Sequence, residues 1–378
     1  DIPMTDPRYF PSSGNAWDRV DPRAAGYAPD RLAAAVAFAQ ANETPWPRGF
    51  YYDDGRYAPN VDWNEVGPWS AVLGPVRERG GSAGMVLQSG RVLASWGEIA
   101  RADMTFSIAK SYLAVLAGLA VDEGLIGDID EPVGKRVPGP LFADAHNAPI
   151  TWRHLLEQTS EWRGELFGKP DQIDHNRLVA PNADNSRKGE LREWQTPGSF
   201  YEYNDVRVNL LSLCLLHLFK RPLPEVLRAR VMDPIGASGD WEWVGYDNSF
   251  VEIDGKRMQS VPGGGHWGGG MFIGAEDHAR FGLLMARGGD WNGKRLLSRE
   301  WIDAMWAPSS QLPNYGLLWW LNRGPHANKA APETAVYALG AGGNMIWIDR
   351  DADMIAVTRW LPSAKAPEFI RQLIAARS

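Results

Sequence analysis

The sequence predicts a mixed α/β protein in which an antiparallel sheet is built from both ends of the chain and is flanked by helices. Short apolar runs typical of strands occur at residues 84–96 and again at residues 315–358. Between them, apolar positions recur with helical spacing, most clearly at residues 107–120 and 204–220. Strands at both ends with helices between them predict a sheet that is interrupted by a mostly helical insertion.

The length of 378 residues is enough for about two domains. We expect residues 1–125 and 290–378 to form the α/β domain, and residues 126–289 to form the mostly helical inserted domain. Hydrophobic residues make up 44% of the chain and charged residues 22%, which is ordinary for a globular protein. The 18 tryptophans are expected mostly in the core, with some of them lining a cleft.

The first part of the chain predicts one helix and one hairpin. A helix is expected over residues 30–42, after a loop-rich start. Strands at 84–88 and 91–96 flank Ser89 and a glycine, which predicts a tight hairpin. Residues 43–80, rich in Pro, Gly, Trp and Tyr, predict an extended covering segment to which the sequence assigns no chemistry.

The middle of the chain predicts helices separated by a polar stretch. Thr151 is placed to cap a short helix that ends near Thr159. Residues 160–200 carry many polar side chains and predict a surface excursion near a site. Helices are then expected over residues 204–220 and 222–233. The expected elements after these are a helix at 276–285, strands at 315–320, 335–339, 344–348 and 354–358, and a helix at 366–376.

A glycine-rich stretch at residues 263–270 interrupts this pattern. It lacks the spacing of a phosphate-binding loop and predicts instead that the backbone passes close to another group. His266, within this stretch, is a candidate substrate-binding residue. His154 lies on an apolar helix and is expected to be structural.

Charge and composition exclude several classes of function. The formal charge is −7 and no basic stripe occurs, which disfavours a nucleic-acid partner. No apolar run reaches the length of a membrane span. The seven histidines show no metal-ligand spacing, and the single Cys214 cannot form an internal disulfide, so we expect no metal site.

We expect a soluble protein, in either the bacterial periplasm or the cytoplasm. The chain begins at Asp1 rather than at methionine, which is compatible with removal of an export signal. The sequence leaves the oligomeric state open.

Ser107 and Lys110 stand three residues apart at the start of the apolar run of residues 107–120. Residues three apart share one face of a helix, so the hydroxyl and the ammonium can touch. A buried lysine is costly unless it is paired or works as a base, and a serine needs a base to become a nucleophile. An S-x-x-K pair supplies one, although the same spacing also fits a solvated lysine on a helix end.

Four segments, in order along the chain, carry a resemblance to a known group of enzymes. Ser107-Ile108-Ala109-Lys110 resembles the S-x-x-K motif, and residues 150–160 resemble the structural segment before the insertion. Residues 197–211 resemble the stretch with the Tyr-x-Asn motif, and residues 338–343 stand where the Lys-Thr-Gly or His-x-Gly strand motif falls. The chain thus resembles the serine β-lactamase and penicillin-binding-protein superfamily, on the branch of class C β-lactamases, family VIII carboxylesterases and 6-aminohexanoate-dimer hydrolases.

The resemblance implies a β-lactamase/transpeptidase-like fold, no cofactor, and catalytic roles for three residues. Ser107 would be the acylated nucleophile, and Lys110 its hydrogen-bonded partner and base. Tyr203 would share the proton transfers. Tyr201 is the competing tyrosine if the register of the motif shifts by two.

The resemblance also implies an oxyanion hole made of the backbone N–H groups of Ser107 and Ala341. Gly340, in the same strand motif, is a candidate substrate-binding residue. This motif departs from the family pattern because Ala338 replaces the lysine or histidine that meets a β-lactam carboxylate. Without that cation, β-lactam binding should be poor, which favours an esterase or amidase.

A second departure is Asp205, which stands where the family usually has asparagine. A carboxylate there either pairs with Lys110 and raises its pKa, or binds an amine on the substrate. The leading hypothesis is a serine hydrolase that acts on a small ester or amide. The alternatives are a D-stereospecific peptidase or amidase, a β-lactamase, and a non-catalytic binding protein that retains the fold.

Overall fold

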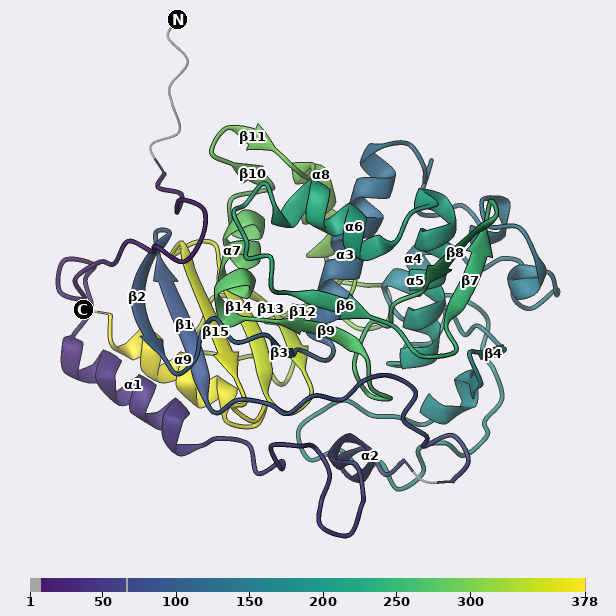
Figure 1. Ribbon diagram of the computed structural model, residues 1–378, viewed down its shortest axis with the longest axis horizontal. Coiled ribbons are helices and arrows are strands. Elements are labelled where there is room, and N and C mark those ends of the chain that lie inside the picture. Colours follow the sequence, from purple (N-terminus) through teal and green to yellow (C-terminus); the bar gives the residue numbers. More distant parts are fainter. Residues whose placement is uncertain (1–7, 66, 378) are drawn as a thin grey trace, which may run out of the picture.

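The sheet predicted from the two ends of the chain is present in the computed structural model, which describes residues 8–65 and 67–377 (Figure 1). It is antiparallel and six-stranded, in the order β12-β13-β14-β15-β1-β2. The strands are β1 (Ala83–Gln88), β2 (Arg91–Trp96), β12 (Trp320–Leu321), β13 (Val336–Gly340), β14 (Asn344–Asp349) and β15 (Met354–Arg359). The strands from the N-terminal and C-terminal parts of the chain meet where β1 pairs with β15, which confirms the predicted sheet.

Helices cover both faces of this sheet (Figure 1). The helices α1 (Pro29–Ala41) and α9 (Ala366–Ala375) lie on one face, and α3 (Ile108–Asp122) and α7 (Ala275–Ala286) lie on the other. Successive side chains of a strand point to opposite faces. Met85 and Leu87 of β1 therefore join the core around α3 and α7, whereas Val86 joins the core beneath α1 and α9.

The remaining elements form the helical region and its edges. The further helices are α2 (Ala58–Asp62), α4 (Trp152–Leu156), α5 (Asp205–Phe219), α6 (Leu223–Leu227) and α8 (Arg299–Met305), with short 3-10 turns at Val133–Lys135, Pro140–Phe142 and Asp171–Asp174 and a π-helical turn at Arg228–Met232. A three-stranded sheet is formed by β3 (Asp103–Met104), β9 (Gly270–Ile273) and β6 (Glu242–Val244). Two-stranded sheets are formed by β4 (Glu165–Leu166) with β5 (Lys169–Pro170), β7 (Phe250–Ile253) with β8 (Lys256–Gln259), and β10 (Asp290–Trp291) with β11 (Lys294–Arg295). Among the residues that the structure describes, no helix combines the length and apolarity needed to cross a membrane.

Helix α3 lies at the centre of the largest apolar core, and its residues 108–120 are all buried. A helix that is apolar on every side is stable only where other elements surround it. Helix α3 contacts α5 as well as β13 and β14. Trp301 of α8 donates its indole N–H to the carbonyl oxygen of Ala114 at 2.9 Å. Ser107, immediately before α3, is therefore attached to a fully packed element.

Helix α7 lies within the chain segment predicted to form the insertion, residues 126–289, yet it packs against β1, β14 and β15 of the large sheet. The approach is close: a Cβ atom at Gly282 would lie 2.9 Å from Cγ2 of Ile355. The division of the chain at residues 126 and 289 remains a prediction.

The prediction of a strand over residues 315–320 is wrong for most of its length, since only Trp320 belongs to β12. Leu318 has φ of +58°, in the left-handed region that strands do not adopt. The N–H of Gly316 donates to the carbonyl oxygen of Trp319 at 2.8 Å, so the chain turns back on itself here. The apolar side chains that suggested a strand are buried in this turn.

The prediction of a surface excursion over residues 160–200 holds for residues 178–200, of which only Lys188 is buried, but is wrong for much of residues 160–177. The charged side chains of Glu161, Asp171, Asp174 and Arg177 are buried. Each has a partner of opposite charge, which offsets much of the cost of removing a charge from water.

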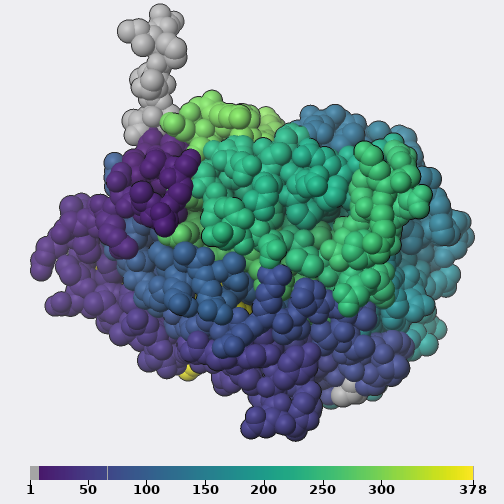
Figure 2. Space-filling view, in the orientation of Figure 1, coloured from purple at the N-terminus to yellow at the C-terminus, as the bar shows by residue number. Residues whose placement is uncertain are grey.

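Residues 43–80 lie across one face of the molecule, as expected of a covering segment (Figure 2). The N–H groups of Leu73 and Gly74 donate to the carbonyl oxygen of Trp267 at 2.7 and 3.0 Å. This segment is therefore attached directly to the glycine-rich stretch at residues 263–270.

The contact between α3 and α8 generates a stability prediction. A Cβ atom at Gly118 would lie 2.1 Å from Cδ1 of Trp301. Alanine is normally favoured over glycine within a helix by about 1 kcal/mol, but here Gly118→Ala should lower the free energy of unfolding by about 1–3 kcal/mol through overpacking. Denaturant unfolding tests this, with Gly239→Ala as control because no heavy atom lies within 4 Å of a Cβ atom there. A stabilising Gly118→Ala would contradict the packing described here.

Candidate active site

Ser107 is the residue immediately before α3, where its φ of −70° already fits the helix. The residue before it, Phe106, has φ of +52°, a conformation that is strained for a bulky side chain. The Phe106 ring is fixed by the rings of Trp46, Phe50 and Trp360, at centroid distances of 5.6, 5.9 and 6.4 Å. This aromatic cluster holds the sharp turn that presents Ser107.

Lys110 is only 2% exposed, and its ammonium reaches Ser107 as the three-residue spacing predicts. Lys110 Nζ donates to Ser107 Oγ at 2.8 Å and to the carbonyl oxygen of Gly263 at 3.1 Å. It also lies 2.6 Å from Asp205 Oδ1. A buried ammonium with an anionic partner and two further acceptors is well satisfied.

Asp205, at the start of α5, binds a second cation as well. Its Oδ2 atom accepts a hydrogen bond from Arg177 Nη1 at 2.8 Å. Burial acts to raise the pKa of Asp205, but the charges of Lys110 and Arg177 outweigh it and hold the pKa well below its usual range. Both carboxylate oxygens of Asp205 therefore already face cations of this chain. The role of Asp205 in binding a substrate amine remains a prediction.

The pKa of Lys110 reflects the same pair. Burial, the largest influence, lowers it. The charge of Asp205 and the Tyr203 phenol together outweigh burial and raise the pKa above its ordinary value. Of the two outcomes expected for a carboxylate at position 205, the structure therefore shows the pairing with Lys110 and the raised pKa.

Tyr203, and not Tyr201, lies beside Lys110. Lys110 Nζ is 4.7 Å from the centroid of the Tyr203 ring, and the ring stacks on Trp320 with centroids 6.2 Å apart. Tyr201 instead makes an edge contact with Tyr315 at 5.3 Å. The register of the tyrosine motif therefore brings Tyr203 to the Ser107–Lys110 pair.

The glycine-rich stretch passes directly over this pair. A Cβ atom at Gly264 would lie 3.6 Å from Ser107 Oγ and 3.5 Å from Lys110 Nζ. At Gly263 a Cβ atom would lie 2.4 Å from Cγ1 of Val208, so a side chain does not fit there. The predicted close approach of this backbone to another group is thus confirmed, and the group is the Ser107–Lys110 pair.

His266, in the same stretch, pairs with the carboxylate of Glu65 and packs edge-on against Trp267 at 5.1 Å. Burial raises the pKa of Glu65 to about 7. Burial, with the nearby Lys188, lowers the pKa of His266 well below its usual range. Glu65 belongs to the covering segment, for which the sequence suggested no chemistry. The role of His266 in binding substrate remains a prediction.

The end of β13 lies against the residues that precede Ser107. A Cβ atom at Gly340 would lie 2.0 Å from the carbonyl oxygen of Thr105, so only glycine fits. The turn after β13 is fixed by Asn344, whose Nδ2 donates to the carbonyl oxygen of Ala341 at 3.0 Å. Arg359 donates to Asn344 Oδ1 at 2.8 Å. These contacts bring the turn that contains Ala341 close to the start of α3.

Arg359 also joins this turn to the strand that leads into Ser107. Its Nη2 atom donates to the carbonyl oxygens of Asp103 and Met104, both at 3.0 Å. Burial lowers the pKa of Arg359 to about 10. One buried guanidinium thus connects the two backbone segments whose N–H groups are the predicted oxyanion donors. The roles of Gly340 and Ala341 toward a substrate remain predictions.

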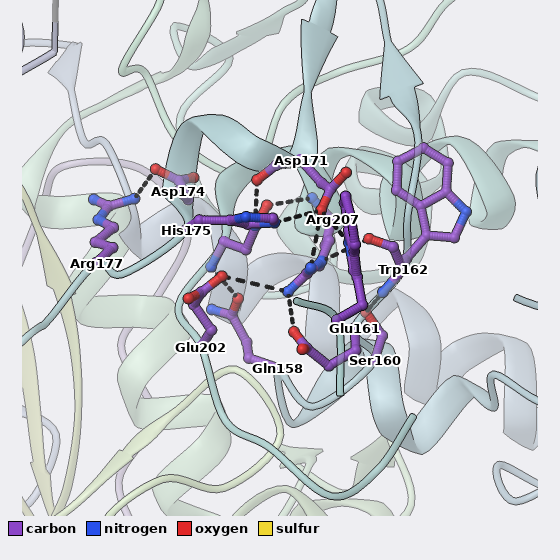
Figure 3. Close-up of polar contacts among 12 residues, drawn as sticks. Gln158, Ser160, Glu161, Trp162, Asp171, Asp174, His175, Arg177, Glu202 and Arg207 are labelled. Carbon is purple, nitrogen blue, oxygen red and sulfur yellow. Dashed lines mark hydrogen bonds and ion pairs between the residues drawn. The ribbon is translucent and has the colours of Figure 1, made fainter. Parts of the chain in front are cut away.

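A second buried network supports the chain around Asp205 (Figure 3). Arg207, on α5, binds Glu161 at 2.9 Å and Asp171 at 3.0 Å. His175 shares the Asp171 carboxylate at 2.9 Å. Glu202 accepts from Arg192 and precedes Tyr203 directly. These pairs fix the loop on one side of the site to α5.

The sequence did not reveal Arg177, Asp174 or Glu65 as neighbours of the site. The contacts of Arg177 with Asp205 and of Glu65 with His266 join residues far apart along the chain. The one local pair, Asp174 with Arg177, does not indicate that it lies beside Asp205. One signal was available: a buried Asp205 in place of asparagine requires a compensating cation. In the described part of the chain, no group of three or more His, Cys, Asp or Glu side chains is arranged to hold a metal ion.

Comparison with known proteins places this geometry in context. The chain is 24% identical to the 6-aminohexanoate-dimer hydrolase of Paenarthrobacter ureafaciens over 306 residues, which cover 72% of this chain and 70% of the relative. A penicillin-binding protein homologue from Caulobacter crescentus superposes with a TM-score of 0.59 at 17% identity, over 93% of this chain and 99% of that one. EstCE1, a hydrolase with promiscuous acyltransferase activity, superposes with a TM-score of 0.58 at 17% identity, over 92% and 98% of the two chains.

The structural neighbours show that the fold is shared, and the family match covers most of the chain. The Beta-lactamase family profile matches residues 70–361, which include Ser107, Lys110, Tyr203 and the turn after β13. The resemblance drawn from the sequence motifs is therefore confirmed: this chain belongs to the Beta-lactamase family.

Proposed function

We propose that this member of the Beta-lactamase family of hydrolases cleaves a small ester or amide through an acyl-enzyme on Ser107. The observation that carries the proposal is the 2.8 Å hydrogen bond between Lys110 Nζ and Ser107 Oγ, with the Tyr203 ring 4.7 Å from the same nitrogen. A serine within hydrogen-bond reach of an amine, with a second titratable group beside it, is the arrangement that nucleophilic catalysis requires.

The proposed reaction has two stages. In the first, Ser107 Oγ attacks the substrate carbonyl carbon while its proton passes to Lys110. The oxyanion accepts hydrogen bonds from the N–H groups of Ser107 and Ala341, and Tyr203 delivers a proton to the leaving alcohol or amine. Lys110 then passes the proton it received to Tyr203. In the second stage, water gives a proton to Lys110 as its oxygen attacks the acyl-ester carbonyl. The bond between the carbonyl carbon and Ser107 Oγ breaks, and Lys110 returns the proton to Oγ, which frees the carboxylic acid and the Ser107 hydroxyl.

The protonation of Lys110 sets the pH at which this reaction runs. An ammonium has no lone pair, so only the neutral amine accepts the Ser107 proton. Because Asp205 favours the ammonium, the neutral fraction at neutral pH is small and grows as the pH rises. Asp205 acts here through Lys110: it positions the base and favours its protonated form.

The surroundings of the site favour a neutral substrate. Ala338 is buried on β13 and offers no cation to a β-lactam carboxylate. Since Asp205 is occupied by Lys110 and Arg177, a substrate amine has no advantage there either. The aromatic side chains of Tyr203, Tyr315 and Trp320 form one cluster beside Lys110, suited to an apolar portion of the substrate. The relative named 6-aminohexanoate-dimer hydrolase supports an amide as the bond that is cleaved.

The identity of the nucleophile is tested by Ser107→Ala. This variant should lose turnover of p-nitrophenyl esters and should no longer be labelled by a fluorophosphonate, read by intact mass, because no serine hydroxyl remains beside Lys110. Ser111→Ala, on the same helix, is the matched control and should keep both signals, since its hydroxyl binds the carbonyl oxygen of Leu318. A wild-type protein that neither turns over nor labels would favour the binding-protein alternative.

The role of the phenol is tested by Tyr203→Phe, which keeps the stacking on Trp320 and removes only the hydroxyl. Loss of one proton-transfer group should lower kcat by about 10²–10⁴-fold with a smaller change in KM. Tyr201→Phe, the control two residues away, should change kcat by much less. Equal losses in the two variants would argue against a specific role for Tyr203.

The pH dependence follows from the raised pKa of Lys110. In the wild type, kcat/KM for an ester should rise with pH through the neutral range and beyond, since a base with a raised pKa becomes neutral only at high pH. Asp205→Asn removes the charge that raises this pKa while burial still lowers it, so the ascending limb should move to lower pH. A pH–rate profile corrected with Ser107→Ala measures both; a limb that stays in place, or moves upward, would refute Lys110 as the base.

A further inference from the structure

Arg177 stands on the far side of the Asp205 carboxylate from Lys110. The two cations bind different oxygens, Arg177 at 2.8 Å from Oδ2 and Lys110 at 2.6 Å from Oδ1. All three side chains are buried. Water therefore screens these charges weakly. Each cation offsets part of the carboxylate charge that the other cation experiences.

We propose that Arg177 is a positioning residue of the active site, which shares the Asp205 carboxylate with Lys110 so that an Arg–Asp pair stands where the superfamily motif has an uncharged asparagine. This inference rests on the proposed function, in which Lys110 acts as the base. Arg177 packs on the Tyr203 ring but makes no hydrogen bond or ion pair with Ser107 or Lys110. It acts through Asp205.

Asp174 binds both Arg177 and the backbone of Asp205. Asp174 Oδ1 lies 3.3 Å from Arg177 Nη1, a contact drawn in Figure 3. The other oxygen of Asp174 accepts a hydrogen bond from the backbone N–H of Asp205 at 2.7 Å. Asp174 also lies 3.4 Å from Lys188 Nζ, so it keeps a cationic partner if Arg177 is removed.

Aromatic rings fix the guanidinium from other elements. Its central carbon lies 4.1 Å from the centroid of the Trp63 ring and 4.9 Å from that of the Tyr203 ring. Trp63 follows α2 in the covering segment, and Tyr203 precedes α5. A planar cation on ring faces has little freedom to turn away, so its charge stays on Asp205.

The physical consequence is a division of one negative charge between two cations. If Asp205 faced Lys110 alone, its full charge would hold the proton on the ammonium and leave less neutral amine to receive the Ser107 proton. Arg177 offsets part of that charge. The superfamily's asparagine needs no such compensation, because it carries no charge.

The remaining charged neighbours do not replace Arg177. Glu65, His266 and Lys188 pair with one another or with Asp174. Of these, only His266, when protonated, would act on the charge of Asp205. Burial keeps that imidazole neutral over the neutral pH range, because its pKa lies well below its usual range.

The test is a double-mutant cycle read by pH–rate profiles. The full-length variants Arg177→Met, Asp205→Asn and their combination are compared with the wild type on a p-nitrophenyl ester from about pH 6 to about pH 10. Methionine keeps an apolar stem against the Trp63 ring and removes the guanidinium, with its charge and its hydrogen bond to Asp205. Arg192→Met is the matched control: Arg192 is also paired in a buried network but contacts Glu161 and Glu202 instead of Asp205.

Arg177→Met should move the ascending limb to higher pH by about one unit, which is about a tenfold loss of kcat/KM at a fixed pH below the limb. KM should change little. Adding Asp205→Asn should restore kcat/KM to the wild-type level or above, since the uncompensated anion is then gone. Arg192→Met should leave the limb in place whatever it does to thermal stability. An unmoved limb in Arg177→Met, or a loss that persists in the combined variant, overturns the proposal.

Turnover and labelling of the wild type distinguish a failure of the proposed function from a failure of the charge-sharing proposal. If the wild type shows neither turnover nor fluorophosphonate labelling, the catalytic assignment fails, and the charge sharing is then measured from thermal unfolding of the same variants. Arg177→Met and Asp205→Asn should be strongly non-additive in Tm, and Arg192→Met with Asp205→Asn should be additive. Additivity in both cycles shows that Arg177 and Asp205 do not act as a pair.

Discussion

The buried ion pair between Lys110 and Asp205 is the interaction on which the site depends. A lysine in the middle of an apolar core is unfavourable unless an anion and further acceptors surround it. Asp205 supplies the anion, and Ser107 and the carbonyl of Gly263 supply the acceptors. The contacts that offset the cost of burying the Lys110 ammonium also orient it toward Ser107. The same atoms therefore contribute to the stability of the fold and to the proposed chemistry.

The groups around this ion pair come from different parts of the fold. Helix α3 brings Ser107 and Lys110, and the start of α5 brings Tyr203 and Asp205. The glycine-rich stretch closes over them because it carries no side chains at the point of contact. The turn after β13 is held against the start of α3 by Arg359 and Asn344. A rigid arrangement of this kind suits a reaction that needs fixed donors and a fixed base.

The parts of this arrangement that the sequence predicts are those with local signals. The spacing of Ser107 and Lys110, the long apolar helices and the hairpin at Ser89 all follow from neighbours a few residues apart. The turn at Leu318 was missed, since its buried apolar residues resemble a strand and only the left-handed backbone distinguishes them. The buried charges of residues 160–200 were missed for another reason: their partners are brought near by the tertiary fold, as Glu161 is to Arg207. The register that selects Tyr203 over Tyr201 became clear only from the contact with Lys110.

The pairing of β1 with β15 has a consequence for how the chain is made. The hairpin of β1 and β2 is synthesised early, but one edge of β1 has no partner until the last strand leaves the ribosome. Joining strands so distant in sequence carries a large loop-closure cost and makes folding slow. An open, apolar edge during that interval is a template for association with other chains. Nascent chains of this protein are therefore exposed to aggregation until β15 has been synthesised, and a chaperone would protect them most during that interval.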